Sequence, residues 1–326
     1  MKMKVLIVSG FLGAGKTTFI KELIRRTDAR PVILENEYGD NSIDAQDLRT
    51  AEPGQKQPEI LEFMEGCVCC TMKDSFVNSV LTVFSGLSPE HLIVEPTGVG
   101  RLSSIIANLK PILHDEITLL RPVVVLAPRS LRHNLNEWGE LYRDQVANAG
   151  TIVFSKGENE APELLEAAEA AVRDLNPGAE IIRDHYSRQE ESWWRSLLDL
   201  PEDREDLPEA EGELPEFTQL TLNHARLENP AQLVLLLEDC LRGELGIIAR
   251  AKGTVPVGGE TLRFDLADGL YCVTGGPQGE NQCVFIGRDL DAGELRRRMG
   301  TSAKAERVSK KGSGEEAGSA AFFLGR

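Results

Sequence analysis

Apolar residues gather in short runs along roughly the first 200 residues, and longer segments with helical periodicity separate the runs. Short apolar runs that are bounded by turn residues are typical of buried strands. We expect strands at Lys4–Ser9, Pro31–Glu35, Ile60–Phe63, His91–Glu95, Pro122–Ala127, Thr151–Phe154 and Glu180–Arg183.

The segments between these strands predict helices. Helical spacing of apolar residues covers Thr17–Arg26, Thr71–Phe84, a segment from Leu131 to Tyr142 that Ser130 is expected to cap, and Ala161–Leu175. Strands that alternate with helices are typical of a parallel sheet covered on both faces. We therefore predict an α/β domain over residues 1–198, with a mostly parallel sheet flanked by helices.

A change of composition marks the end of this domain. Residues 199–216 hold nine acidic residues, one arginine and three prolines, which predicts an acidic linker. Residues 217–300 then predict a smaller α+β domain, and residues 301–326 a flexible tail. The expected elements of the α+β domain are strands at Phe217–Leu222, Thr261–Phe264, Leu270–Thr274 and Gln282–Ile286, and helices at Pro230–Leu241 and Asp291–Met299.

Composition and charge narrow the class of protein. The 326 residues are 41% apolar and carry a formal net charge of −16, so intrinsic disorder is not expected. A surface this acidic repels nucleic acid and anionic lipid, and we find no apolar run long enough to cross a bilayer. Six cysteines are too few for a disulfide scaffold of this size. We expect a cytoplasmic protein that binds neither nucleic acid nor membranes.

A glycine-rich loop joins the first strand to the first helix. Residues 10–18 read Gly-Phe-Leu-Gly-Ala-Gly-Lys-Thr-Thr and fit the phosphate-loop pattern in its required context. Backbone amides of such a loop surround phosphates, the lysine contacts the terminal phosphates and the first threonine binds Mg²⁺. The predicted nucleotide-binding residues are Gly10, Gly13, Ala14, Gly15, Lys16, Thr17 and Thr18.

Three cysteines, Cys67, Cys69 and Cys70, lie within four positions directly before a predicted helix. Thiols at a helix N-terminus have lowered pKa values, and three thiolates suit a soft ion such as Zn²⁺, Co²⁺ or Cu(I). Two other interpretations stay open. Cys67 and Cys70 fit a redox pair, and all three fit small buried side chains.

Carboxylates follow two of the predicted strands. Glu95 ends an apolar strand and precedes Pro-Thr-Gly98, which is the usual place of an Mg²⁺-facing acid and a γ-phosphate sensor. Glu37 and Asp44 lie in the loop after the second strand. These two are candidates for positioning an ion or a water molecule, although exposed loop acids are the more common explanation.

Together these motifs resemble the CobW-like branch of the CobW/HypB/UreG family of P-loop GTPases, which are regarded as metallochaperones. The resemblance rests on residues 10–18, Asn-Glu-Tyr-Gly at 36–39, Ile-Asp at 43–44, Gly-Cys-Val-Cys-Cys at 66–70 and Glu-Pro-Thr-Gly at 95–98. It continues through Gln-Val-Ala-Asn-Ala at 145–149, Arg-Ala-Lys-Gly at 250–253 and Val-Phe-Ile-Gly-Arg at 284–288.

The resemblance implies a GTP-hydrolysing metallochaperone with Mg²⁺ as its cofactor. Lys16, Glu95 and Gly98 are then the catalytic residues, the three cysteines hold Zn²⁺ or Co²⁺, and Glu37 and Asp44 belong to a switch. The expected partners are GTP, a transition metal and a client metalloprotein, and the resemblance allows a homodimer.

One departure concerns the nucleobase. Where the family reads Asn-Lys-x-Asp, this chain has Ser155-Lys156-Gly157-Glu158, so a longer carboxylate replaces the one that recognises guanine. The resemblance still implies that Ser155, Lys156 and Glu158 bind the nucleotide. We identify neither an arginine finger nor a catalytic glutamine, which predicts slow turnover. The alternatives are a nucleotide-gated interaction module with structural cysteines and an ATP-dependent kinase.

Overall fold

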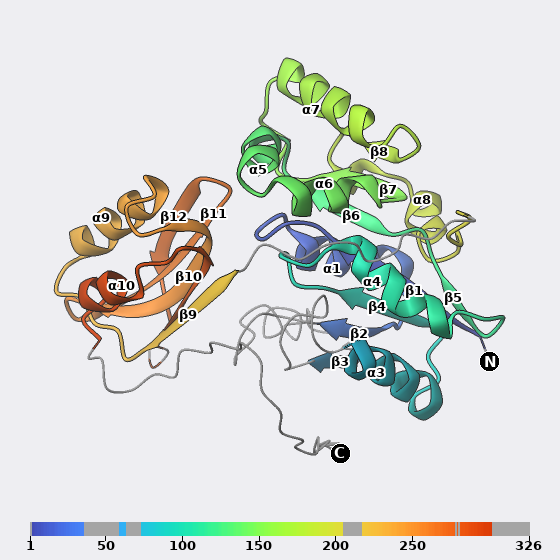
Figure 1. Ribbon diagram of the computed structural model, residues 1–326, viewed down its shortest axis with the longest axis horizontal. Helices are drawn as coiled ribbons and strands as arrows, with labels where there is room; N and C mark the ends of the chain where they lie inside the picture. Colours follow the sequence, from blue (N-terminus) through green and yellow to red (C-terminus); the bar gives the residue numbers. More distant parts are fainter. Residues whose placement is uncertain are drawn as a thin grey trace.

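The computed structural model describes residues 2–35, 59–62, 73–204, 217–277, 279 and 281–301, and these form two sheets with helices packed on them (Figure 1). The N-terminal sheet has eight strands within this part of the chain, in the order β3-β2-β4-β1-β6-β7-β8, with β5 also beside β1. All of its pairings are parallel, so the predicted α/β class is confirmed. The strands are Met3–Ser9 (β1), Val32–Glu35 (β2), Glu59–Glu62 (β3), His91–Glu95 (β4), Ile117–Leu119 (β5), Val123–Leu126 (β6), Thr151–Phe154 (β7) and Glu180–Ile182 (β8).

Helices cover both faces of this sheet. Alternate residues of β1 face opposite cores, with Val5 and Ile7 in one and Leu6 and Val8 in the other. Helices α1 and α8 pack on the second core, while α3, α4, α5, α6 and α7 contribute to the first. The helices are Lys16–Thr27 (α1), Lys73–Gly86 (α3), Leu102–Leu109 (α4), Leu131–Glu137 (α5), Gly139–Ala147 (α6), Pro162–Leu175 (α7) and Glu191–Ser196 (α8).

The segment after Ser130 differs from its prediction. It forms two short helices, α5 and α6, which meet at Trp138, where one helix was expected. Ser130 does not cap α5, because its backbone is helical and its hydroxyl donates to the carbonyl of Ala127 at 3.1 Å. The hydroxyl of Ser130, which we expected to cap the helix, instead forms its hydrogen bond within the 3₁₀ turn Pro128–Ser130 before α5.

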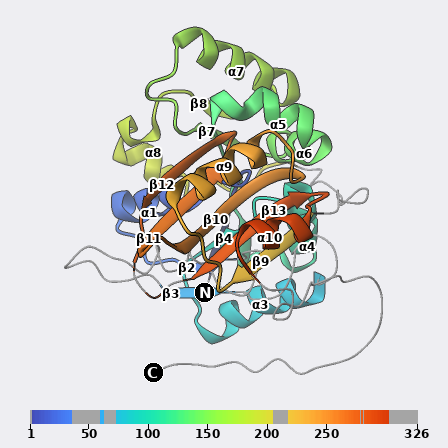
Figure 2. The same cartoon turned by 90° about the vertical axis from the view of Figure 1, so that its left-hand side faces the viewer.

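The C-terminal sheet is antiparallel, with the order β12-β11-β10-β13-β9. Helices α9 and α10 pack on one of its faces around a core that includes Phe264 and Phe285. The other face is turned toward the N-terminal domain (Figures 1 and 2). The elements of the C-terminal domain are Thr218–Asn223 (β9), Pro230–Leu241 (α9), Ile247–Val257 (β10), Glu260–Ala267 (β11), Leu270–Gly275 (β12), Gln282–Arg288 (β13) and Ala292–Arg298 (α10).

Strand β10 is the central strand of this sheet, and the sequence prediction missed it. Its 11 residues include Gly253 and Pro256, which argue against a strand. Gly253 is required by close packing, since a Cβ there would lie 2.6 Å from the Cα of Cys283. Pro256 is tolerated because β13 pairs with β10 only as far as Thr254, and Pro256 lies beyond that point.

The two domains share a packed interface. Val284, Ile286 and Ala249 of the C-terminal sheet belong to the same hydrophobic core as β1 and β4. The ring of Trp138 stacks on that of Phe217 at a centroid distance of 5.1 Å, and the guanidinium of Arg288 lies 4.8 Å from its centre. The arrangement of the two domains therefore depends on apolar packing and on the cation–π contact of Arg288 with Trp138.

Residues 199–204 of the acidic segment lie against the N-terminal domain. Asp199 forms an ion pair with Lys4, and Asp203 forms one with Arg121 at 2.7 Å. Leu120 pairs with Pro201 in an isolated bridge. None of the helices in the described ranges is both long and apolar enough to cross a membrane.

Candidate functional site

The phosphate loop leaves β1 and enters α1 through three glycines with positive φ. Gly10, Gly13 and Gly15 have φ values of +142°, +77° and +96°, a backbone conformation that disfavours other residues. Gly10 also lies against β6, because a Cβ there would be 2.2 Å from the carbonyl oxygen of Val125. The loop therefore presents its amides at the N-terminus of α1, where the helix dipole favours an anion.

Lys16 is the first residue of α1 and is buried. Its ammonium donates to the carbonyl of Gly10 at 3.1 Å and to that of Phe11 at 3.4 Å. These contacts hold the positive charge within the loop that would surround the phosphates. Lys16 thus occupies the position at which the lysine of a phosphate loop neutralises the terminal phosphate oxygens.

Thr17 and Glu95 form the acidic side of the site. The hydroxyl of Thr17 donates to Oε1 of Glu95 at 2.8 Å, and Glu95 is buried at the end of β4. Glu35 ends the neighbouring strand β2 in register with Glu95, so a second buried carboxylate lies beside the first. Sequence reasoning missed this pairing, because it depends on the order of the strands.

This donor set fits Mg²⁺, because one hydroxyl and a neighbouring carboxylate are hard oxygen ligands for an ion that keeps several water molecules. Thr17 and Glu95 are the residues that would hold it. The bound ion would neutralise charge on the phosphate oxygens.

Gly98 lies against the phosphate loop. A Cβ at Gly98 would be 2.5 Å from the backbone nitrogen of Leu12, so only glycine fits there. The buried amide of Gln145 donates to the carbonyls of Gly98 and Gly100 at 3.1 and 2.9 Å. Gln145 thus fixes the segment after Glu95, which gives a physical reason for the glutamine in the Gln-Val-Ala-Asn-Ala motif.

The residues at the expected base-recognition motif face different neighbours. The Ser155 hydroxyl donates to the carbonyl of Ala14 at 2.6 Å and so contacts the phosphate loop. Lys156, with φ of +56°, forms an ion pair with Asp268 at 3.0 Å. Oε1 of Glu158 lies 2.8 Å from Nε2 of His185. The structure therefore does not aim these three side chains at one point.

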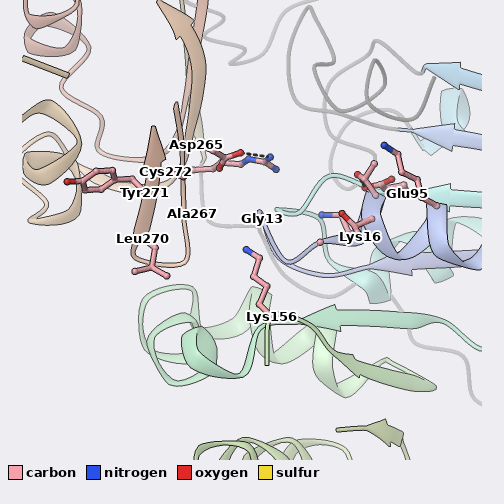
Figure 3. Close-up of a pocket in the computed structure, with 14 residues that line it drawn as sticks. Gly13, Lys16, Glu95, Lys156, Asp265, Ala267, Leu270, Tyr271 and Cys272 are labelled. Carbon is pink, nitrogen blue, oxygen red and sulfur yellow. Dashed lines mark hydrogen bonds and ion pairs between the residues drawn. The ribbon is translucent and has the colours of Figure 1, made fainter. Parts of the chain in front are cut away.

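A pocket of about 510 Å³ opens beside the phosphate loop, and both domains line it (Figure 3). The C-terminal contribution comes from the start of β12, the end of β11 and β10. Sequence reasoning missed this contribution, and its only signal was the Arg-Ala-Lys-Gly motif. The lining residues are Gly13, Gly15, Lys16, Thr17, Thr18, Lys21, Glu95, Lys156, Arg250, Asp265, Ala267, Leu270, Tyr271 and Cys272.

Comparison with known families accounts for both domains. The family model described as "CobW/HypB/UreG, nucleotide-binding domain" matches residues 4–183, which is more than half of the chain. The chain belongs to the CobW/HypB/UreG family. A second model, "Cobalamin synthesis protein cobW C-terminal domain", matches residues 217–302. The resemblance to the CobW/HypB/UreG family that the sequence motifs indicated is thus confirmed.

Two curated relatives of this protein are named as zinc chaperones. It is 31% identical to the zinc chaperone YeiR of Escherichia coli over 198 residues, which are 60% of this chain and 58% of that protein. It is 29% identical to the zinc chaperone CobW of a Sinorhizobium species over 211 residues, 57% of this chain and 56% of that protein. The chain thus matches a little over half the length of these relatives.

Among solved structures, the Zn(II)-bound YjiA GTPase from E. coli aligns with 92% of this chain and 98% of its own chain. The sequence identity is 17% and the TM-score is 0.44.

Five of the candidate residues lie outside the described part of the chain: Glu37, Asp44, Cys67, Cys69 and Cys70. Within the described ranges, no group of three or more His, Cys, Asp or Glu side chains is placed to hold a metal ion. The prediction of a thiolate site at the three cysteines therefore still depends on the sequence.

The cysteine Cys272 should report on occupation of the pocket, with the buried Cys240 as an internal comparison. Cys272 is exposed and lines it, whereas burial raises the pKa of the Cys240 thiol to about 12. In a chain with serine at positions 67, 69 and 70, we expect iodoacetamide to label Cys272 first, because only an accessible thiolate reacts. Nucleotide should slow this labelling about tenfold, measured by mass spectrometry. Equal labelling rates with and without nucleotide would contradict binding in this pocket.

Proposed function

We propose that this protein is a GTP-dependent zinc chaperone that hydrolyses GTP, binds a transition metal at Cys67, Cys69 and Cys70, and delivers it to a client protein. The observation that carries the nucleotide part is the 2.8 Å contact of Thr17 with Glu95 beside Lys16, in a pocket of about 510 Å³. The zinc part is supported by the names of the curated relatives.

The proposed roles in hydrolysis follow from position. Amides of the loop from Gly13 to Thr18 surround the phosphates, and Lys16 neutralises charge on their terminal oxygens. The segment that ends at Gly98 touches the loop backbone, so a change at the terminal phosphate reaches Glu95 through a direct contact. Glu37 and Asp44 are proposed to belong to the switch that responds to this change.

The choice of GTP is proposed on the motif at residues 155–158. Lys156 lines the pocket, and a carboxylate at position 158 keeps the charge that guanine recognition requires. The contact of Glu158 with His185 holds that carboxylate away from a base until it rearranges. We therefore expect weaker discrimination between GTP and ATP than an aspartate at this position would give.

The cargo is proposed to be Zn²⁺, with Co²⁺ as the alternative metal. Three thiolates leave one tetrahedral position open, which suits an ion that is handed to a client. A chaperone of this kind needs a metal affinity that depends on the bound nucleotide, because hydrolysis can release cargo only through such coupling.

The experiment that tests this function compares Zn²⁺ affinity in the full chain with a non-hydrolysable GTP analogue and with GDP. We expect a difference of about tenfold, within the usual range of coupling between two sites. Serine at positions 67, 69 and 70 should remove the binding, whereas the control Cys240→Ala, which removes a buried thiol outside the pocket lining, should keep it. Equal affinities in the two nucleotide states would contradict the coupling. Unchanged zinc binding in the triple variant would favour an interaction module with structural cysteines.

A further inference from the structure

The C-terminal sheet closes one side of the nucleotide pocket. Ala267 at the end of β11 approaches the phosphate loop so closely that a Cβ at Gly13 would lie 2.5 Å from its Cβ. The neighbouring Asp268 binds Lys156 at 3.0 Å. Figure 3 shows the turn between β11 and β12 on the side of the pocket opposite Lys16 and Glu95. A nucleotide bound to the loop therefore lies between two domains.

Arg250 is the cation that this sheet brings to the pocket. The pairing of β10 with β13 shifts between Ile248 and Arg250, so that Arg250 lies opposite Ile286. Ile286 belongs to the core shared with the N-terminal domain, so Arg250 is on the face turned toward that domain. Irregularities of this kind redirect side chains near functional sites.

The contact between Arg250 and Asp265 is loose. Nη2 of Arg250 lies 3.6 Å from Oδ2 of Asp265, which is longer than a hydrogen bond. The Arg250 side chain is only 14% exposed, whereas that of Asp265 is 47% exposed. The guanidinium thus lies in a largely desolvated position at the wall of the pocket, where a phosphate oxygen would be a strong, charge-assisted partner.

The charges around the pocket favour a polyanion although the whole chain is acidic. Four of the lining residues are cationic and two are anionic, and the cations are Lys16, Lys21, Lys156 and Arg250. Arg250 differs from the others because it is an arginine, whose planar fork matches phosphate oxygens. It is also the one of these four that the C-terminal domain supplies.

We infer that Arg250 contacts the terminal phosphates of the bound nucleotide and stabilises the transition state of hydrolysis, as an arginine finger that the C-terminal domain supplies to the N-terminal domain of the same chain. This inference rests on the proposed GTPase function. Water attacks the γ-phosphorus, the bond from that phosphorus to the β–γ bridging oxygen breaks, and its electron pair stays on the β-phosphate of GDP. The water oxygen bonds to that phosphorus and keeps one proton, and its other proton goes to another oxygen of the released phosphate. Arg250 neutralises the charge that develops on the oxygens during this step.

Asp265 has the opposite effect in this arrangement. It competes with the phosphate for Arg250 and adds a negative charge to the wall of the pocket. Loss of Arg250 should therefore weaken triphosphate binding and slow hydrolysis, whereas loss of the Asp265 charge should strengthen triphosphate binding. If the ion pair of Arg250 and Asp265 only holds β10 and β11 together, loss of either charge should weaken triphosphate binding.

The test uses the full chain and the variants Arg250→Ala, Arg250→Lys and Asp265→Asn. The matched control is Arg263→Gln, which removes the same charge from an exposed position on β11 that does not line the pocket. Single-turnover GTP hydrolysis, affinity for a GTP analogue and for GDP, and trapping of GDP with aluminium fluoride are measured for each. Thermal unfolding shows whether each variant is folded.

We expect Arg250→Ala to slow hydrolysis about 100-fold and to abolish aluminium fluoride trapping, with GDP affinity changed less than about threefold. Lysine should restore only part of the rate, because it lacks the fork. Asp265→Asn should raise affinity for the GTP analogue. Hydrolysis by Arg250→Ala at the wild-type rate, or weaker analogue binding in both the alanine and the asparagine variants, would overturn the inference while the proposed function stands. Absence of GTP hydrolysis in the wild-type chain would instead overturn the proposed function.

Discussion

Replacement of Gly98 with alanine is expected to reduce GTP hydrolysis about 100-fold or more, because the change displaces the phosphate loop itself. The added methyl group would lie 2.5 Å from the nitrogen and 2.8 Å from the Cα of Leu12, and 2.8 Å from the carbonyl carbon of Phe11. All three are backbone atoms of the loop, so no side chain can rotate away to make room. The loop has to move, and the free energy of unfolding should fall by about 1–3 kcal/mol.

A matched glycine provides the control for this prediction. Gly86 lies at the end of α3, and a Cβ there would meet no atom within 4 Å. Gly86→Ala should therefore hydrolyse GTP as the wild type does and unfold at nearly the same temperature. The comparison uses single-turnover hydrolysis and thermal unfolding. Wild-type hydrolysis by Gly98→Ala would show that the contact between the two segments has no part in catalysis.

The second large effect is expected for Lys16→Ala. Removing this buried ammonium takes away the positive charge that the loop carbonyls of Gly10 and Phe11 hold in the pocket. We expect hydrolysis to fall about 1000-fold and affinity for a GTP analogue to fall more than affinity for GDP, because the missing charge faces the terminal phosphates. Nucleotide titration and single-turnover hydrolysis measure the two effects.

An exposed lysine serves as the control for Lys16. Lys110 lies in a short 3₁₀ helix after α4, away from the pocket lining, so Lys110→Ala should change neither measurement. If Lys16→Ala hydrolyses GTP within about threefold of wild type, the phosphate loop is not the site of the reaction. Unfolding temperatures of both variants show whether a loss of rate reflects a loss of fold.

The sequence predicts the part of the site that depends on local order. The phosphate loop can be predicted because a strand, three glycines, a lysine and a helix follow closely on one another in the sequence. Glu95 is readable because it ends an apolar strand, and a parallel sheet brings such ends to one edge. Both inferences need only the neighbours of a residue in the chain and the general geometry of the fold.

The remaining part depends on pairings over long distances in the sequence. Arg250 reaches the pocket through the shift between Ile248 and Arg250, and the Arg-Ala-Lys-Gly motif at 250–253 marks the position without indicating that shift. Strand β10 was missed because Gly253 and Pro256 count against a strand until their partners are known. The pairing of Glu35 with Glu95 depends likewise on β2 and β4 being neighbours.

The interface around Trp138 has a consequence for how the two domains can be exchanged between relatives. Phe11 of the phosphate loop packs on Trp138 at 5.5 Å, and Trp138 in turn contacts Phe217 and Arg288 of the C-terminal domain. Substitutions in this group are constrained across the domain boundary. A chimaera assembled at the acidic segment therefore has to keep all four side chains compatible, and the unit that is inherited together is larger than either domain.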